Sequence, residues 1–189
     1  FLVTSYTGGN RFRAGTLTNS GMTLGSVVAA SANTSHYHRI QFDPLTSGRA
    51  VLAMSEYGTS SMVNVCYVIT VSGNTLTFGS QHIWSTDTGT GVAVAFSTTV
   101  AGLFVASGSP GSGAGKLVAG QISGTSITFG TPVQYSTSHA TFPNVSLDGY
   151  ENKFIICWAD TQAKIATVSG TTITLGSGFT VAWQELYSN

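Results

Sequence analysis

A motif of nine residues occurs four times in this chain of 189 residues. Its copies end at glycines separated by 54, 51 and 46 residues, and three of them read apolar-Ser-Gly-Asn/Thr-x-apolar-Thr-apolar-Gly. A period of this length is typical of proteins built from stacked or radially arranged β units. The repeat therefore constrains the architecture much more than the activity. The copies occupy residues 17–25, 71–79, 122–130 and 168–176.

Each copy has the residue pattern of a tight β-hairpin, with an alternating strand, a short polar turn and a second alternating strand. The turn position holds Asn19, Gly73, Gly124 or Gly170, which are residue types that accept a positive φ at little steric cost. After each turn, apolar residues alternate with threonine, so the apolar side chains share one face of the strand. We therefore expect four hairpins, each with one buried face.

Reading outward from the hairpins gives units of four short antiparallel strands. Four strands in about 50 residues is the plan of a β-propeller blade. We predict an all-β fold in which residues 1–189 form one β-propeller segment made of four-stranded antiparallel blades. A two-sheet sandwich is the alternative, for which a strictly repeating sequence is less expected. The expected blade units are approximately residues 1–31, 32–85, 86–136 and 137–183.

The first unit is one strand short. Residues 1–7, 11–18 and 22–30 align with strands two, three and four of the later units, so strand one has no counterpart. Residues 183–189 follow the last strand four without an obvious alternating pattern. We therefore expect a segment of a longer propeller. The alternative is a self-contained four-bladed ring in which the C-terminal residues pair beside the first blade.

The chain carries unusually little charge. Charged residues make up 7% of it, with 7 basic and 7 acidic side chains, whereas about 25% is usual in soluble domains. Without clusters of Lys and Arg, the chain has no electrostatic footprint for nucleic acid or anionic membranes. No apolar run approaches the ~20 residues of a membrane span. We expect no nucleic-acid partner and no membrane insertion.

The motifs that usually carry catalysis or cofactor binding do not occur in this sequence. It has no nucleophile elbow, no His-Glu-x-x-His helix and no phosphate-binding loop. The four histidines, at positions 36, 38, 82 and 139, form no cluster with zinc-type spacing, and neither cysteine belongs to one. Cys66 and Cys157 occupy non-equivalent strands two units apart, so we expect free thiols, with a disulfide as the alternative. We expect no catalytic residue, no metal and no cofactor.

Most acidic residues have a structural explanation. Asp43 and Asp148 fall at the same turn between strands one and two, where a carboxylate caps backbone N–H groups. Residues 85–92 resemble the Asp-box of sialidase-type propellers, but Val92 stands where the box has an aromatic residue, and no arginine triad is present. Glycan cleavage would need two carboxylates roughly 5–10 Å apart. The pair to test for it is Glu56 with Asp160 or Asp87.

Binding is the remaining class of function. In a propeller, the loops between strands two and three and the connections between blades gather on one face. Neutral hydrogen-bonding groups beside aromatic rings on that face suit sugars. In the alternative interpretation, Tyr37 and Tyr57 pack on loop backbones and the histidines are solvated or satisfied in the core. The ligand-binding candidates are Tyr37, His36, Glu56, Tyr57, His139 and Asp160.

Three further aromatic residues have a simpler interpretation. Trp84 and Tyr135 occupy the same strand-four position, five residues after their repeat glycines, and Trp158 lies in a strand two. Aromatic residues that vary at one repeat position usually fill gaps between blades. We expect all three to be packing residues, with a role as sugar-stacking platforms as the alternative.

The repeat apolar-x-apolar-Ser-Gly-Thr-x-Ile-Thr-Phe-Gly-x-x-x-x-aromatic, preceded by a strand such as residues 49–57, resembles repeats of predicted β-propellers in phage tail-fibre-like and other secreted or virion surface proteins. The resemblance covers essentially the whole chain and carries no specific binding residues. It implies an extracellular or virion-surface location and a non-enzymatic, fibre-type module that recognises a host-surface glycan or receptor. The alternative is a decoration or assembly domain without a ligand, which contacts other structural subunits or further copies of itself.

Overall fold

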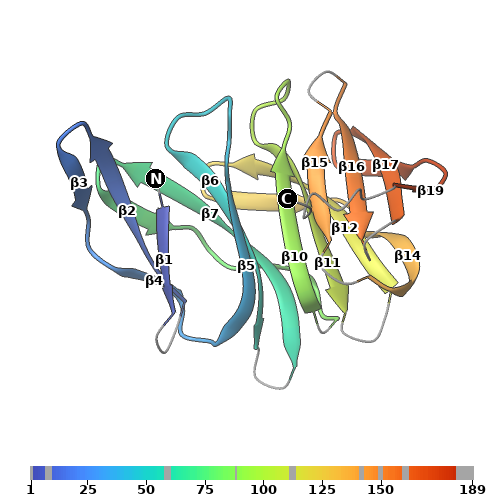
Figure 1. Ribbon diagram of the computed structural model, residues 1–189, viewed down its shortest axis with the longest axis horizontal. Coiled ribbons are helices and arrows are strands. Elements are labelled where there is room, and N and C mark those ends of the chain that lie inside the picture. The colour runs from blue at the N-terminus through green and yellow to red at the C-terminus, as the bar shows by residue number, and fades with distance from the viewer. Residues whose placement is uncertain are drawn as a thin grey trace, which may run out of the picture.

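The computed structural model describes residues 2–6, 10–57, 61–87, 89–110, 114–140, 143–148, 151–158 and 162–181. Their β-strands belong to four antiparallel sheets. In Figure 1 the sheets follow one another along the long axis, with the first sheet (blue) and the last sheet (red) at opposite ends. The fold is therefore all-β, and its arrangement fits a series of propeller-like blades.

Each sheet is formed by one stretch of the chain. The first sheet contains β1 (Leu2–Tyr6), β2 (Asn10–Thr18), β3 (Gly21–Leu24) and β4 (Val28–Ser31). The second contains β5 (Ser35–Phe42), β6 (Arg49–Tyr57), β7 (Met62–Ser72), β8 (Thr75–Phe78) and β9 (His82–Ser85). The third contains β10 (Gly89–Phe96), β11 (Leu103–Pro110), β12 (Ala114–Ser123), β13 (Ser126–Phe129) and β14 (Val133–His139). The fourth contains β15 (Asn144–Leu147), β16 (Lys153–Trp158), β17 (Gln162–Ser169), β18 (Thr172–Leu175) and β19 (Phe179–Thr180).

The predicted fourth strand of each unit is two short strands in the structure. In the second sheet the order is β5-β6-β7-β8, and β9 also pairs with β7; the third and fourth sheets repeat this order. The break comes at the repeat glycine, because the hairpin of the next sheet approaches there. A Cβ atom on Gly79 would lie 2.3 Å from the carbonyl oxygen of Thr125. The expectation of one continuous strand was therefore wrong.

The first sheet agrees with the alignment of the repeats. β1 pairs with β2 in register from Leu2 opposite Ala14 to Tyr6 opposite Asn10, as strand two pairs with strand three in the other sheets. Among the described residues, the first sheet has no counterpart of β5. Figure 1 shows β5, β10 and β15, the first strands of the complete sheets, side by side, and β10 contacts both of its neighbours. These three strands, called the inner strands from here on, form the surface on which the candidate site lies.

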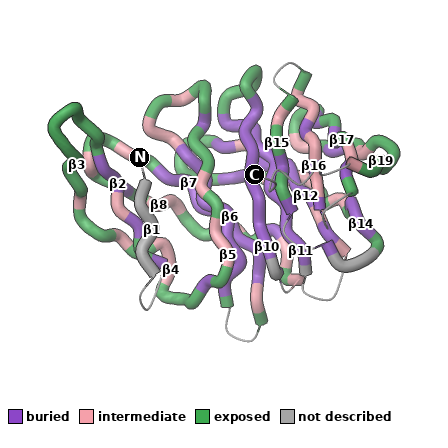
Figure 2. Tube along the Cα trace, in the orientation of Figure 1, coloured by how far each residue is buried: buried purple, intermediate pink, exposed green. Residues whose placement is uncertain are grey.

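Among the described residues, the hydrophobic core consists of three clusters, one between each pair of successive sheets. The first joins Phe12 and Ala14 to Leu52 and Ile69. The other two repeat this arrangement between the second and third sheets and between the third and fourth sheets. Figure 2 shows the consequence: buried residues dominate the middle of the molecule, whereas β3 and β19 at its two ends are exposed or only partly buried.

The hairpin turns use glycine as expected in three units. Gly73, Gly124 and Gly170 have φ values of 57°, 60° and 56°, a region that suits glycine because it has no Cβ. In the first unit the positive φ falls on Gly21, at 148°, and not on Asn19. The predicted turn at Asn19 is confirmed, since residues 19 and 20 form the turn of this hairpin, but the positive φ falls on the glycine that follows it.

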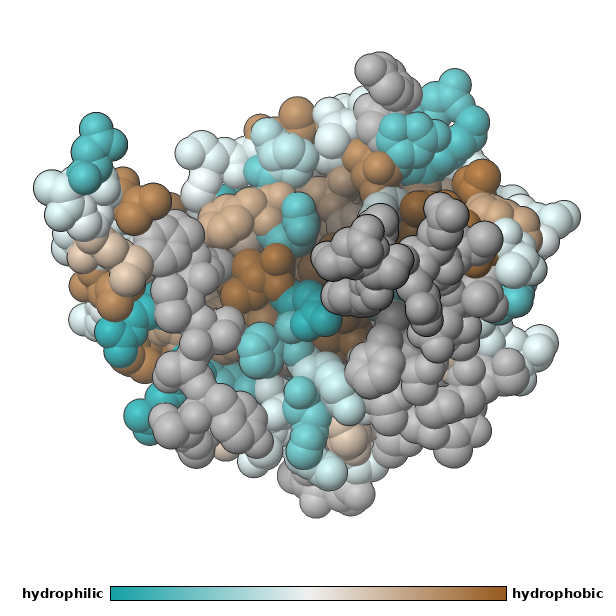
Figure 3. Space-filling model, in the orientation of Figure 1, coloured by the Kyte–Doolittle hydropathy of each residue, from teal (hydrophilic) through white to brown (hydrophobic). Residues whose placement is uncertain are grey.

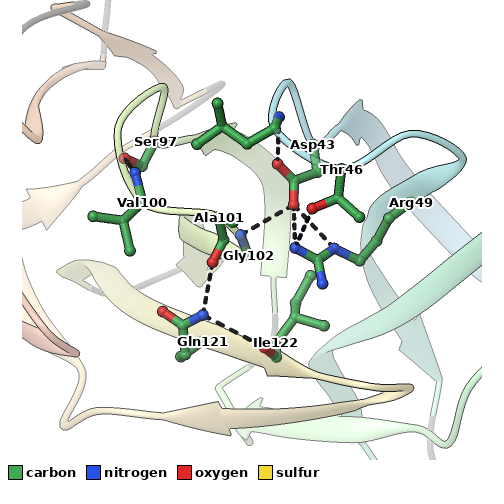
Figure 4. A network of polar contacts seen from close by, with 10 residues as sticks. Asp43, Thr46, Arg49, Ser97, Val100, Ala101, Gly102, Gln121 and Ile122 are labelled. Atoms are coloured by element: carbon green, nitrogen blue, oxygen red, sulfur yellow. Dashed lines mark hydrogen bonds and ion pairs between the residues drawn. The ribbon is translucent and has the colours of Figure 1, made fainter.

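Asp43 caps its turn and also joins two sheets (Figure 4). Its carboxylate accepts hydrogen bonds from the backbone N–H of Leu45 (2.9 Å) and from Arg49 Nε (2.9 Å). It also accepts one from the backbone N–H of Gly102 in the third sheet (3.0 Å). Burial by itself raises the pKa of Asp43, but the bonds from Arg49, Leu45 and Gly102 outweigh burial and leave the pKa lowered. The predicted turn-capping role of Asp43 is confirmed.

The lowered pKa predicts a pH-dependent contribution of Asp43 to stability. The contribution is complete well above the ordinary carboxyl pKa of 3.8 and is lost as the pH falls through the lower pKa of the folded state. We expect Asp43→Asn to lower the free energy of unfolding by about 2 kcal/mol at pH 7. Urea unfolding from pH 7 to pH 2 should show this difference shrinking below pH 3.8. Asp148→Asn, at the exposed equivalent position, is the control, and an Asp43→Asn difference that is independent of pH would contradict the prediction.

Candidate functional site

A cleft of about 370 Å³ lies on the inner strands of the three complete sheets. Strand β10 supplies residues 91–94, which are buried, and strands β5 and β15 contribute polar side chains. Because successive side chains of a strand point to opposite faces, the residues that share the cleft on β5 recur at every second position. The polar and aromatic side chains lining it are Tyr37, Arg39, Gln41, Asn144 and Ser146.

The polar groups of the cleft are accessible. Gln41, Asn144 and Ser146 are exposed, and Tyr37 is half-buried. Figure 3 shows hydrophilic and hydrophobic side chains intermixed over the central part of the face that it draws. The cleft thus combines an aromatic ring, two amides and a hydroxyl above a buried apolar strand. Such a lining offers both hydrogen bonds and apolar contact to a ligand.

Arg39 is the charged residue of the cleft among the lining residues described. Its side chain is exposed, and Nη1 donates a hydrogen bond to the carbonyl oxygen of His38 (3.0 Å). Burial lowers the pKa of His38, and the charge of Arg39 lowers it further. This combination favours a neutral His38 beside a positive Arg39, and the described lining of the cleft carries the positive charge of Arg39.

Three predicted site residues form an aromatic group next to the cleft. The ring of His36 lies 5.2 Å from that of Tyr57 in a T-shaped arrangement and 6.4 Å from that of Tyr37. We expected these residues in loops, but β5 begins at Ser35 and β6 continues to Tyr57. The strands are longer than expected because Ser35 pairs with Glu56 across a bulge. Tyr37 belongs to both features and connects the aromatic group to the cleft.

Glu56 lies inside the protein rather than on its surface. Its side chain is fully buried and accepts hydrogen bonds from Asn33 Nδ2 (3.2 Å), from the Tyr67 hydroxyl (3.3 Å) and from Gln81 Nε2. Burial and the charge of Glu56 raise the pKa of Tyr67 to about 12, so the phenol remains a hydrogen-bond donor at neutral pH. The carboxylate thus belongs to a buried polar network that holds the end of β6 against Asn33 and Gln81.

Two predicted site residues do not join this group in the described structure. His139 is the last residue of β14, where its backbone lies opposite Ala114. We expected a connecting loop there, whereas the strand extends through it. Asp160 lies outside the described residues. Its place in a ligand-binding site therefore stays a prediction.

The three large aromatic residues interpreted as packing residues are buried. Trp84 and Trp158 are each 8% exposed and Tyr135 is 1% exposed, and all three belong to the clusters between sheets. The rings of Tyr135 and Trp158 are 5.0 Å apart. The packing role is confirmed. Both cysteines are free, as predicted, with Cys66 buried and Cys157 half-buried.

A second, more open cleft of about 330 Å³ lies beside Asp87. Asp87 forms an ion pair with Lys116 (2.6 Å) and accepts a hydrogen bond from Ser85 Oγ (2.9 Å). These bonds from Lys116 and Ser85 lower the pKa of Asp87. The carboxylate of the stretch that resembles an Asp-box thus lies between β9 and β10 and is paired with a lysine.

Neither a metal centre nor a membrane-spanning helix emerges from the described residues. No group of three or more His, Cys, Asp or Glu side chains in this part of the chain could hold a metal ion. A helix long and apolar enough to cross a membrane is likewise not found there.

Four residues of the main cleft were not among the predicted site residues: Arg39, Gln41, Asn144 and Ser146. The predicted site residues were expected in loops, whereas these four lie within strands β5 and β15. A signal was present in the sequence, because polar residues alternate at positions 37, 39 and 41 and at positions 144 and 146. Polar alternation on an inner strand, where no further strand can cover it, points to an open cleft.

Comparisons with known proteins assign no family to this chain. No protein-family model matches it, and no curated protein has a matching sequence. The functional interpretation therefore rests on the cleft and on the arrangement of the four sheets.

Proposed function

We propose that the four sheets are successive blades of a β-propeller and that the protein is a non-enzymatic, fibre-type module that binds surface glycans through the cleft on its inner strands. Its location would be extracellular or on a virion surface. The observation that carries the proposal is the convergence of Tyr37, Gln41 and Asn144 in one accessible cleft.

The chemistry of this cleft matches that of a sugar ring. A pyranose has C–H groups on its faces, which pack against an aromatic ring such as that of Tyr37. Its hydroxyls lie at the edge and both donate and accept hydrogen bonds, as do the side-chain amides of Gln41 and Asn144 and the hydroxyl of Ser146. Because Gln41, Asn144 and Ser146 are already exposed to water, they require little rearrangement to exchange water for sugar hydroxyls.

Arg39 suggests the class of glycan. A guanidinium pairs in bidentate fashion with carboxylates and sulfates, and Arg39 is exposed at the cleft. We therefore expect acidic glycans to bind more tightly than neutral ones, and this preference to weaken at high salt. Arg39→Gln should remove the preference and leave the binding of neutral glycans intact.

The experiment is a glycan array probed with the full chain, followed by titration of the glycans that bind. We expect Tyr37→Ala and Asn144→Ala each to weaken binding about tenfold, since a lost ring contact or hydrogen bond costs about 1–1.5 kcal/mol. Gln134→Ala is the matched control, because Gln134 is an exposed amide on β14 outside the cleft. Its binding should equal that of the unsubstituted chain.

Two results would overturn this proposal. A folded chain that binds nothing on a broad array is not a glycan-binding module. Binding that survives both Tyr37→Ala and Asn144→Ala takes place somewhere other than the cleft. Incubating the bound glycans with the protein tests the enzymatic alternative, and we expect no new reducing ends.

An assembly domain is the second candidate function. The observation that favours it is the exposure of large apolar side chains on the two end sheets, such as Leu17 (73%) and Ile165 (43%). Exposed apolar surface of this kind often marks contact with another protein. A glycan-binding cleft on the inner strands and subunit contacts on the end sheets are compatible with each other.

A further inference from the structure

The junctions between successive sheets repeat one contact. The repeat glycine of each of the first three sheets lies against the hairpin turn of the next sheet. A Cβ atom on Gly25 would lie 1.8 Å from the carbonyl oxygen of Asn74, and one on Gly130 would lie 1.9 Å from that of Thr171. Gly79 and Thr125 form the same contact, with a distance of 2.3 Å. Three junctions therefore depend on a turn that fits against a glycine.

A second contact also recurs at the junctions. The residue that directly follows the first strand of a complete sheet reaches the turn between the first two strands of the next sheet through its side chain. Asp43 accepts a hydrogen bond from the backbone N–H of Gly102 (3.0 Å), and Ser97 Oγ bonds to Asn152 Oδ1. Asp43 is 5% exposed and Ser97 is fully buried. Each junction between complete sheets thus combines a hairpin turn packed against a glycine with a side-chain hydrogen bond.

The last sheet presents the same features without an occupant among the described residues. Gly176 is exposed, and the nearest atom to a Cβ placed on it is the carbonyl oxygen of Ile165 in its own sheet, at 3.5 Å. Asp148, which is equivalent to Asp43 and Ser97, is exposed. Ile165 is 43% exposed, whereas the equivalent Val68 is 1% exposed and Ala119 is fully buried. We call this surface, made of Asp148, Ile165, Gly176 and Phe179, the trailing face.

The first sheet presents the complementary half, again judged from the described residues. Its hairpin exposes Met22 (52%), whereas the equivalent Leu76, Ile127 and Ile173 are buried against the preceding sheet. Leu17 and Leu24, on the same side of this hairpin, are 73% and 38% exposed. Its turn, Asn19-Ser20, corresponds to the turns that meet the repeat glycines in the other sheets. We call the surface made of Leu17, residues 19–20, Met22 and Leu24 the leading face.

We propose that a second copy of this chain docks head to tail, with the Asn19-Ser20 turn of one copy against Gly176 of the other. The internal junctions specify the occupant, because they show which surface fits each face, and one chain carries both halves. The apolar side chains of the two faces would pack as their buried equivalents do. This proposal goes beyond glycan binding and involves none of the cleft residues.

A head-to-tail contact of this kind is heterologous, so the same contact is available again on the added copy. If the rotation between sheets closes the arrangement, a ring of defined mass forms; if it does not, an open chain grows with concentration. Both outcomes produce species heavier than the single chain of 19.6 kDa. Sedimentation across a range of concentrations distinguishes the ring from the open chain.

The test is the mass of the full chain in solution, measured by analytical ultracentrifugation, for the unsubstituted protein and for Gly176→Ala. The added methyl group has room in the single chain but would collide with a docked turn, as the internal glycines show. We expect Gly176→Ala to weaken association at least tenfold and to leave the circular dichroism spectrum unchanged. Ser177→Ala, at the exposed neighbouring residue, should associate normally.

Met22→Ser on the leading face should weaken association in the same way, because it removes apolar contact from the opposite half of the junction. Mixing Gly176→Ala with Met22→Ser restores one intact junction per pair and should yield a heterodimer. A chain that is monomeric at every concentration tested would overturn the proposal, since the two faces of separate copies would then not bind each other. Association unaffected by either substitution would overturn it as well, because the copies would then meet elsewhere.

Discussion

Replacing Gly130 with alanine is expected to lower the free energy of unfolding by about 3 kcal/mol, near the upper end of what overpacking costs. The new Cβ atom would lie 1.9 Å from the carbonyl oxygen of Thr171 and 2.8 Å from its carbonyl carbon. Because both atoms belong to the backbone, the hairpin of the fourth sheet has to move away and loosen the adjacent cluster. Urea unfolding monitored by circular dichroism measures the loss.

Gly176→Ala is the matched control, since the same change is made at the same position of the repeat. Its Cβ meets only an atom at ordinary van der Waals distance, 3.5 Å, so we expect a stability change within about 0.5 kcal/mol. Both variants should be measured at low protein concentration, because association of the folded chain would add to the apparent stability. Equal losses in the two variants would show that the turn-on-glycine contact does not hold the sheets together.

Phe104→Ala is expected to lower the free energy of unfolding by about 4 kcal/mol, the typical cost of deleting a fully buried phenylalanine ring. Phe104 is fully buried in the cluster between the second and third sheets. Its ring packs 5.6 Å from that of Phe96 and 6.1 Å from that of Phe129. The strand opposite carries Gly120, where a Cβ would lie 2.5 Å from Phe104 Cζ, so the ring fills the space that the glycine leaves. Urea or thermal unfolding measures the effect.

Phe42→Ala serves as the control for this prediction. Phe42 is 39% exposed, so its removal leaves no closed cavity and should cost about 1 kcal/mol or less. The ratio between the losses in free energy of unfolding for Phe104→Ala and Phe42→Ala tests whether packing in the clusters between sheets is the main source of stability. A loss for Phe104→Ala as small as that for Phe42→Ala would mean that neighbouring sheets collapse readily into the vacated space.

The division into four sheets was predictable because the residues that specify each hairpin lie close together in the sequence. The alternation of apolar residues and threonine, together with glycine at the turn, specifies a hairpin whatever surrounds it. Four copies of that hairpin indicated four sheets, and the missing strand of the first unit could be recognised by aligning β1 with strand two. The turn role of Asp43 and the packing roles of Trp84 and Trp158 could be inferred for the same reason, because each occupies a defined place in the repeat.

The candidate site was predictable only in part. Tyr37 lines the cleft, and His36 and Tyr57 lie beside it as a group. The other polar residues of the cleft come from β5 and β15, which are far apart in the sequence and meet only when the sheets assemble around β10. Glu56 looked like an accessible carboxylate, yet it is fully buried, because Asn33, Tyr67 and Gln81 approach it from neighbouring elements.

The sequence by itself determined the number of sheets, the order of their strands and the positions of the turns, because these depend on residues close together in the chain. Only the tertiary structure decided where strand four breaks, which polar residues are buried and which faces stay open. Those outcomes depend on contacts between sheets, such as the carbonyl of Thr125 against Gly79, and the hydrophobic pattern of a single hairpin carries no information about its neighbour. Gly176 has the same motif as Gly79 and Gly130, yet in the described structure it alone of the three lacks a turn packed against it.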